Sequence, residues 1–93
     1  MIVNFSCRET ERIWHGRRTR RFPADIQDQA LRKLRLIDAA MILEDLKNPP
    51  GNRLESLKGD RADQMSIRIN QRWRICFRWD NGKVHDVHIV DYH

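Results

Sequence analysis

The chain has 93 residues, 40% of them hydrophobic, which is enough to bury one hydrophobic core and leaves no room for a second. We therefore expect a single domain spanning residues 1–93. The 18 basic and 13 acidic residues give a net charge of +5, and 14 of the basic residues are arginine. Arginine binds phosphate through a planar guanidinium, so the composition favours nucleic acid as a partner. The simpler interpretation is a basic surface that is merely solvated.

The same sequence argues against several classes of protein. Cys7 and Cys76 lie 69 positions apart, which indicates neither a disulfide framework nor a zinc-binding motif. The opening segment "MIVNFSCRETER" has too few apolar residues for a signal peptide, and no apolar run is long enough to span a membrane. We expect a soluble cytoplasmic protein with no membrane partner.

The first half of the chain carries helical patterns. Residues 2–5 ("IVNF") predict a short strand, residues 7–16 predict a short helix that ends at Gly16, and residues 16–21 ("GRRTRR") form a basic loop. Pro23 suits the first turn of a longer helix, which "NPPGN" at residues 48–52 must end. The core face of that helix is predicted from residues at helical spacing: Ile26, Ala30, Leu34, Ile37 and Met41.

The second half carries strand patterns, and helices followed by strands indicate an α+β fold. The segment "WDNGKV" at residues 79–84 predicts a hairpin, for which two registers compete. A two-residue loop would pair Ile75 with His88, whereas a three-residue loop with Gly82 in the left-handed position would pair Ile75 with Val87. The hydrophobic pattern favours the three-residue loop.

In that register the two faces of the sheet differ in character. The core face is expected to hold Trp73, Ile75, Phe77, Val87 and Ile89, with Ile67 and Ile69 from the "SIRIN" segment. The exposed face is expected to hold Ser66, Arg68, Asn70, Arg72, Arg74, Arg78, His88 and, farther along, Tyr92. The exposed face is therefore predicted to be rich in arginine.

A metal site at the end of the chain is disfavoured. His85 and His88 lie three positions apart on a predicted strand, so their side chains should point to opposite faces. Tetrahedral coordination by both from one regular strand would have poor geometry. We expect no metal and no cofactor.

From residue 49 to residue 93 the chain resembles the HigB branch of the RelE-type toxins. The elements "LKGDR", "SIRIN", "WRICF" and the terminal "DYH" carry the resemblance together, and "RKLRLIDAA" in the long helix extends it. It implies a RelE-like microbial ribonuclease-type fold, with an N-terminal strand and two helices packed on one face of a mainly antiparallel sheet. It also implies a bacterial toxin that cleaves mRNA in the A site of the 70S ribosome without a metal, held inactive by a helix-turn-helix antitoxin of the HigA type.

The resemblance also implies roles for individual residues. Arg74 matches the arginine of the family's "WRI" motif and would bind the scissile phosphate, and Lys58 of "LKG" would be the second cation. The terminal "DYH" matches the family's ending, so His93 becomes a candidate general acid or base, Tyr92 a stacking and hydroxyl-donating residue, and Asp91 an orienting carboxylate.

Cleavage of RNA without a metal requires a base for the 2′-hydroxyl, an acid for the leaving 5′-oxygen and cations for the transition state. This chain departs from the family at Glu55, where the relatives carry histidine. Either Glu55 replaces that histidine as base, or His93 acts more alone, or activity is weaker. Further RNA contacts are expected from eight arginines: Arg17, Arg18, Arg20, Arg21, Arg53, Arg61, Arg68 and Arg72.

Two hypotheses from other classes compete with the endoribonuclease. One is a non-catalytic RNA-binding or ribosome-binding module, in which the arginine face binds only phosphates. The other is an interaction protein whose exposed sheet or helices serve a protein partner.

Overall fold

The computed structural model describes residues 1–61 and 63–91 of the chain. Tyr92 and His93, both predicted to belong to the site, lie outside the described residues, as does the side chain of Arg61.

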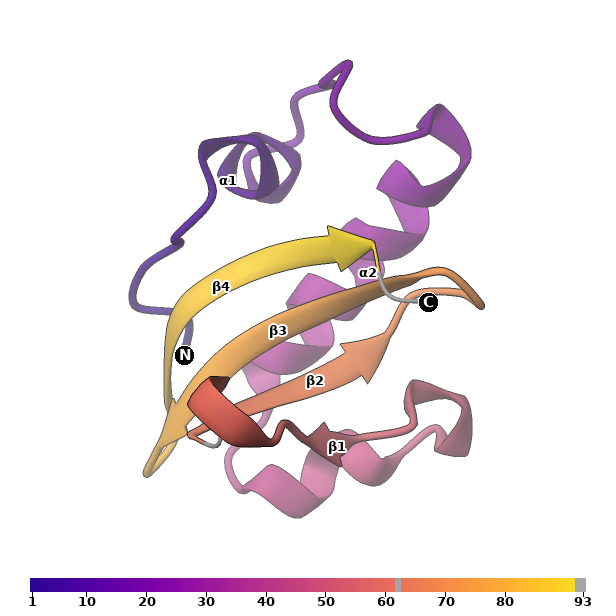
Figure 1. Ribbon diagram of the computed structural model, residues 1–93. Helices are drawn as coiled ribbons and strands as arrows, with labels where there is room; N and C mark the ends of the chain where they lie inside the picture. The colour runs from indigo at the N-terminus through magenta and orange to yellow at the C-terminus, as the bar shows by residue number, and fades with distance from the viewer. Residues whose placement is uncertain (62, 92–93) are drawn as a thin grey trace.

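Two helices precede an antiparallel sheet. The helices are α1 (Arg8–Trp14) and α2 (Ala24–Ala39), and the strands are β1 (Glu55–Ser56), β2 (Gln64–Arg68), β3 (Trp73–Asp80) and β4 (Lys83–Asp91). The sheet has the order β1-β2-β3-β4. The described residues also include three short 3₁₀ helices: η1 (Leu43–Lys47), η2 (Pro50–Asn52) and η3 (Gly59–Arg61). The predicted α+β class is confirmed, and Figure 1 shows α2 crossing behind the sheet.

The core lies between α2 and one face of the sheet. Ile26, Ala30, Leu34 and Ile37 of α2 are buried, as the helical spacing predicted. From the sheet they meet Ile67, Ile69, Ile75, Phe77, Val87 and Ile89, which are buried too, while Trp73 packs partly buried against them. Within the described residues no helix is both long enough and apolar enough to cross a membrane.

Met41 was wrongly assigned to this core, because its side chain is 81% exposed. The helix α2 ends at Ala39, two residues earlier than the apolar spacing predicted. The Asp45 carboxylate accepts the backbone N–H groups of Met41 and Ile42 at 2.9 and 3.2 Å. These hydrogen bonds begin η1 in place of another turn of α2.

The predicted N-terminal strand is present only as an extended segment along β4. Ile2 and Phe5 form isolated parallel bridges with Val84 and Val87, and no regular strand joins them. The segment still covers the edge of β4, where unpaired backbone groups would otherwise be exposed. Asp86 on β4 lies between the two bridges and interrupts the ladder there.

The favoured hairpin register was wrong. Asp80 pairs with Lys83, so the loop has two residues, and both Asn81 (φ 49°) and Gly82 (φ 91°) adopt the left-handed conformation that this loop requires. Farther along, the register shifts by one residue at a β-bulge, so that Ile75 pairs with Ile89. The bulge satisfies both the Asn-Gly turn and the apolar pattern, which a regular ladder could not do.

The bulge also overturns the prediction for the two histidines. Direct cross-strand partners share a face, and His85 pairs with Arg78 while His88 pairs with Cys76. Since Cys76 and Arg78 are two positions apart on β3, both histidines lie on the same face. Even so, residues 1–61 and 63–91 contain no group of three or more His, Cys, Asp or Glu side chains that could hold a metal ion.

Asp86 fixes the bulge and ties the N-terminal segment to it. Its φ of 57° is left-handed, a conformation that Asp and Asn tolerate better than most residues. Its carboxylate accepts hydrogen bonds from the Asn4 side-chain amide at 3.0 Å and from Arg78 Nε at 2.7 Å. These two hydrogen bonds, the one from Asn4 first, lower the pKa of Asp86.

The stabilising effect of Asp86 should therefore depend on pH. A carboxyl group with a lowered pKa in the folded state stabilises the fold above its ordinary pKa of about 4, and loses this effect as the pH falls through the folded-state pKa. The substitution Asp86→Asn keeps a residue that tolerates the left-handed conformation and removes the charge. We expect it to lower the melting temperature at pH 7, and the difference from the unsubstituted protein to shrink below about pH 4.

Thermal unfolding followed by circular dichroism at a series of pH values measures this difference. Asp60→Asn, at an exposed position of η3, is the matched control and should show little difference at any pH. A difference for Asp86→Asn that stays constant down to pH 3 would contradict a role for its charge.

Candidate active site

A cavity of about 370 Å³ lies where β2, β3 and the segment before β1 meet. Its lining residues are Arg53, Glu55, Arg68, Asn70, Gln71 and Arg74. Arg68 and Arg74 are direct cross-strand partners and alternate with Ile67 and Ile75, which face the core. The cavity therefore opens on the face of the sheet opposite α2. Among the described residues, three arginines and one glutamate line the cavity, which gives this lining a positive charge.

Arg74 occupies the predicted face but is buried there, with 6% of its surface exposed. Its Nε donates a hydrogen bond to Ser66 Oγ at 2.9 Å, and its Nη2 donates to the backbone carbonyl oxygens of Arg53 at 2.6 Å and Ser66 at 3.3 Å. The sequence predicts that Arg74 is exposed to solvent on the outer face of the sheet. Its side chain is instead buried, because the guanidinium is bound by Ser66 and by the backbone at Arg53. Its orientation is fixed before any ligand binds.

Two neighbours complete the surroundings of Arg74. Arg53 adopts the left-handed conformation, with φ 46°, at the end of η2, and this conformation accompanies the 2.6 Å hydrogen bond from the guanidinium to its carbonyl oxygen. The Glu55 carboxylate lies 3.9 Å from Arg74 Nη2 and is about half exposed. The structure therefore brings Glu55 beside Arg74, with its carboxylate accessible from the cavity.

Arg68 presents a second guanidinium beside the first. Cross-strand pairs of like charge are destabilising unless something separates or neutralises them. Arg68 Nε donates to the backbone carbonyl of Asn70 at 2.9 Å, which holds this side chain along its own strand. An anion between Arg68 and Arg74 would relieve the repulsion, so the pair is suited to bind phosphate.

Three residues with roles in this cavity were not predicted as site members. Asn70 Oδ1 accepts the backbone N–H groups of Arg72 and Trp73 at 2.8 and 2.9 Å, which shapes the β2–β3 turn. Gln71 lies exposed in that turn and lines the cavity, and Ser66 holds Arg74. Asn is frequent in turns because its side chain accepts nearby backbone N–H groups, so Asn70 offered a signal.

Asp91 lies away from this cavity and is bound to Arg72. Arg72 Nε and Nη2 donate to the two oxygens of Asp91 at 2.7–2.9 Å, and the guanidinium lies 5.7 Å from the centre of the Trp73 ring. The hydrogen bonds and the charge of Asp91 raise the pKa of Arg72. Because Asp91 pairs directly with Trp73, the register places it on the face opposite Arg74.

Two further predicted parts of the site, both within the described residues, do not line the cavity. Lys58 is exposed in the connection between β1 and η3 and is not among the lining residues. The basic loop at residues 16–21 lies beside α1, where Arg18 and Arg20 line a separate cavity with Glu9 and Arg12. Among the described residues, the predicted site therefore divides into the cluster at Arg74, the Arg72–Asp91 pair, Lys58 and the basic loop.

Comparison of the chain with known proteins shows the family to which it belongs. The family model described as "RelE-like toxin of type II toxin-antitoxin system HigB" matches residues 4–93. The chain belongs to the HigB-like toxin family. The resemblance inferred from the sequence is confirmed, and membership in a type II toxin-antitoxin family implies a cognate antitoxin.

Two curated relatives agree with this family. "Toxin HigB-1" of Vibrio cholerae is 37% identical over 83 residues, which cover 88% of this chain and 87% of the relative. "Endoribonuclease HigB" of Proteus vulgaris is 32% identical over 93 residues, which cover 100% of both chains. Among solved structures, a YoeB/ParE toxin from Agrobacterium tumefaciens aligns with a TM-score of 0.49 at 22% identity, over 100% of this chain and 95% of that one.

The burial of Arg74 leads us to expect that its removal lowers the stability of this HigB-like chain. Arg74→Ala removes the donor to the buried oxygens of Ser66 and to the partly buried carbonyl of Arg53, so we expect a loss of about 1–3 kcal/mol in the free energy of unfolding. Arg68→Ala is the matched control on the same face. Since Arg68 is less buried and bonds within its own turn, its removal should change the free energy by under about 0.5 kcal/mol.

Equilibrium unfolding in urea measures both values. Equal stabilities of Arg74→Ala and Arg68→Ala would show that the contacts of Arg74 do not hold this part of the sheet together.

Proposed function

We propose that this HigB-like toxin is an endoribonuclease that cleaves mRNA in the A site of the 70S ribosome without a metal. The observation that carries the proposal is the fixed guanidinium of Arg74, held by Ser66 and Arg53 at the base of an open, positively charged cavity beside Arg68 and Glu55. The relative from Proteus vulgaris, named an endoribonuclease, matches this chain from end to end.

In the proposed mechanism Arg74 and Arg68 bind the scissile phosphate and stabilise the charge that develops on it. The exposed Glu55 carboxylate accepts the proton of the 2′-hydroxyl. The 2′-oxygen then forms a bond to phosphorus as the bond to the 5′-oxygen breaks, which leaves a 2′,3′-cyclic phosphate. His93 donates a proton to the leaving 5′-oxygen.

Supporting roles are proposed for three further residues. Lys58 supplies positive charge from the edge of the site once RNA is bound. Tyr92 stacks on a base and donates its hydroxyl hydrogen. Asp91 acts at a distance from the phosphate, through its hydrogen bonds to Arg72, by holding the end of β4 against the start of β3.

The ribosome is proposed to supply orientation that this site lacks. Glu55 stands where the family resemblance implies a histidine, and Lys58 and the basic loop lie apart from the Arg74 cavity. Fixing the message against such a site can contribute several kcal/mol to the reaction. The proposed phosphate contacts are Arg17, Arg18, Arg20, Arg21, Arg53, Arg61, Arg68 and Arg72.

The cellular setting follows from the same proposal. We place the toxin in the bacterial cytoplasm, as a single domain of residues 1–93, with a helix-turn-helix antitoxin of the HigA type as its inhibitor.

Cleavage by purified toxin tests the proposal directly. Programmed 70S ribosomes should support rapid cutting of the message, whereas the same message free in solution should be cut at least about a hundredfold more slowly. Mapping the 5′ ends of the products locates the cut, and Glu55→Gln should slow it on the ribosome. Equal cutting of free and ribosome-bound message would contradict ribosome dependence. Binding to ribosomes without any cutting would favour a non-catalytic ribosome-binding module.

The proposed roles of Tyr92 and His93 predict a separation of activity from stability. Deleting both residues should abolish cleavage and leave the melting temperature nearly unchanged, because Val87 and Ile89 keep β4 in the core. His93→Gln should abolish cleavage by itself, while Tyr92→Phe should retain part of it. A truncated toxin that cuts ribosome-bound message at the full rate would remove both residues from the mechanism.

A further inference from the structure

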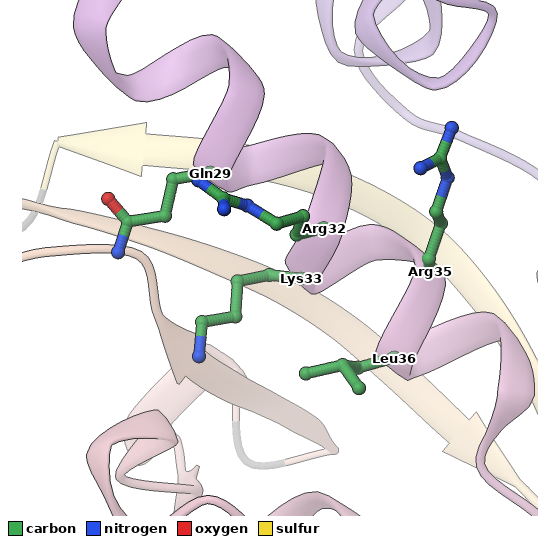
Figure 2. A pocket seen from close by; sticks show the side chains of 5 residues that line it. All are labelled: Gln29, Arg32, Lys33, Arg35 and Leu36. Carbon is green, nitrogen blue, oxygen red and sulfur yellow. The ribbon is translucent and has the colours of Figure 1, made fainter.

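A second cavity lies on α2, on the other side of the sheet from Arg74. It has a volume of about 540 Å³ and is lined by Gln29, Arg32, Lys33, Arg35 and Leu36, which we call the α2 groove. Figure 2 shows Gln29, Lys33 and Leu36 projecting from the same side of the helix, with Arg35 farther round it. Their spacing of four and three residues places these three side chains on one helical face.

The positive charge of the α2 groove is not neutralised within the described part of the chain. None of the ion pairs among residues 1–61 and 63–91 involves Arg32, Lys33 or Arg35. Two of the three acidic residues on α2 are engaged elsewhere: Asp28 pairs with Arg18 at 3.4 Å, and Asp38 accepts the backbone N–H of Ile2 at 2.9 Å. The third, Asp25, lies in the first turn of the helix and does not line the groove. Three cations thus line the groove with no acidic side chain among them.

Lys33 is the fixed cation of the groove. Its Nζ donates a hydrogen bond to the side-chain oxygen of Asn52, which is fully buried and donates in turn to the carbonyls of Leu46 and Asn48 at 3.2 Å. Partial burial, followed by the nearby charge of Arg32, lowers the pKa of Lys33. A carboxylate entering the groove would offset both effects.

Leu36 makes the groove partly apolar. Its side chain is 39% exposed and lies on the same side of the helix as Lys33 in Figure 2. The aliphatic stem of a lysine can extend an apolar surface of this kind. Phosphate groups gain nothing from an exposed leucine, whereas an amphipathic peptide segment gains contacts with both the leucine and the cations. The groove therefore suits a protein partner better than RNA, and the sheet face that carries the Arg74 cavity points away from it.

We propose that the α2 groove is the docking site for an acidic, amphipathic segment of the cognate antitoxin. Acidic side chains of that segment pair with Arg32 and Arg35, and an apolar side chain packs on Leu36. This inference rests on the proposed function only for the type of the antitoxin, because family membership already implies that a cognate antitoxin exists.

The test uses this 93-residue chain and its cognate antitoxin. Affinity is measured by isothermal titration calorimetry, and cleavage is measured in parallel on programmed 70S ribosomes. The double variant Arg32→Glu, Arg35→Glu reverses two exposed charges without touching Lys33. We expect it to weaken antitoxin binding by at least about tenfold and to leave the cleavage rate within about twofold.

A matched control carries the same change in net charge elsewhere. Arg8→Glu with Lys83→Glu alters two exposed cations on α1 and β4, outside the groove, and should change antitoxin affinity by less than about threefold. Leu36→Ala tests the apolar contact and should weaken binding with no change in its salt dependence. Circular dichroism checks that every variant is folded.

Each result bears on the proposal. Unchanged antitoxin affinity in the Arg32→Glu, Arg35→Glu variant overturns it, and so does an equal loss of affinity in the control variant. Loss of ribosomal cleavage with intact antitoxin binding would assign the groove to ribosomal RNA and also overturns it. A selective loss of affinity supports the docking site even if the unsubstituted toxin cleaves no message, in which case the proposed enzymatic function alone has failed.

Discussion

The rest of the site depends on the hydrogen bonds that the buried guanidinium of Arg74 donates to Ser66 and Arg53. A charged side chain with 6% exposure is stable in a protein only when its donors have partners, and Ser66 and the carbonyl of Arg53 provide them. Those partners come from β2 and from the turn before β1, so the hydrogen bonds of one side chain position three segments of chain. Arg68 lies on β2 and Glu55 begins the strand that follows this turn, which explains why they meet around the same cavity.

On the opposite edge of the sheet, the β-bulge at Asp86 positions the β3–β4 hairpin and the N-terminal segment. It allows a two-residue Asn81–Gly82 turn and a continuous apolar face to exist in one hairpin. It also provides the carboxylate that binds Asn4 and Arg78, so the N-terminal segment is held along β4. The geometry of the long hairpin is thus fixed at its turn, while its other end, at Arg72 and Asp91, is closed by a bidentate ion pair.

Much of the fold could be predicted from the sequence, because it follows from local periodicity. The buried residues of α2 repeat at helical spacing, and the core residues Ile67, Ile75 and Phe77 alternate with outward-facing residues along their strands. The order of helices before strands follows from where these two patterns occur in the chain. The bulge could not be predicted, because a one-residue shift depends on how two distant constraints are satisfied together. The burial of Arg74 depends in the same way on the left-handed turn at Arg53, which has no clear signature in "PGNRLE". The predicted partners Glu55 and Arg68 did assemble at Arg74, whereas Lys58 and the basic loop remained apart, since sequence similarity assigns residues to a site without giving their distances.

The central claim is that Arg74 is preorganised to bind the scissile phosphate, and one substitution tests it most directly. Arg74→Lys keeps the positive charge but lacks the planar fork that reaches Ser66, Arg53 and a phosphate at once. Single-turnover cleavage on programmed 70S ribosomes, at saturating toxin, isolates the chemical step from binding. The account predicts a cleavage rate lower by about a hundredfold or more with nearly unchanged affinity for the ribosome. A variant that cleaves at the unsubstituted rate would contradict it.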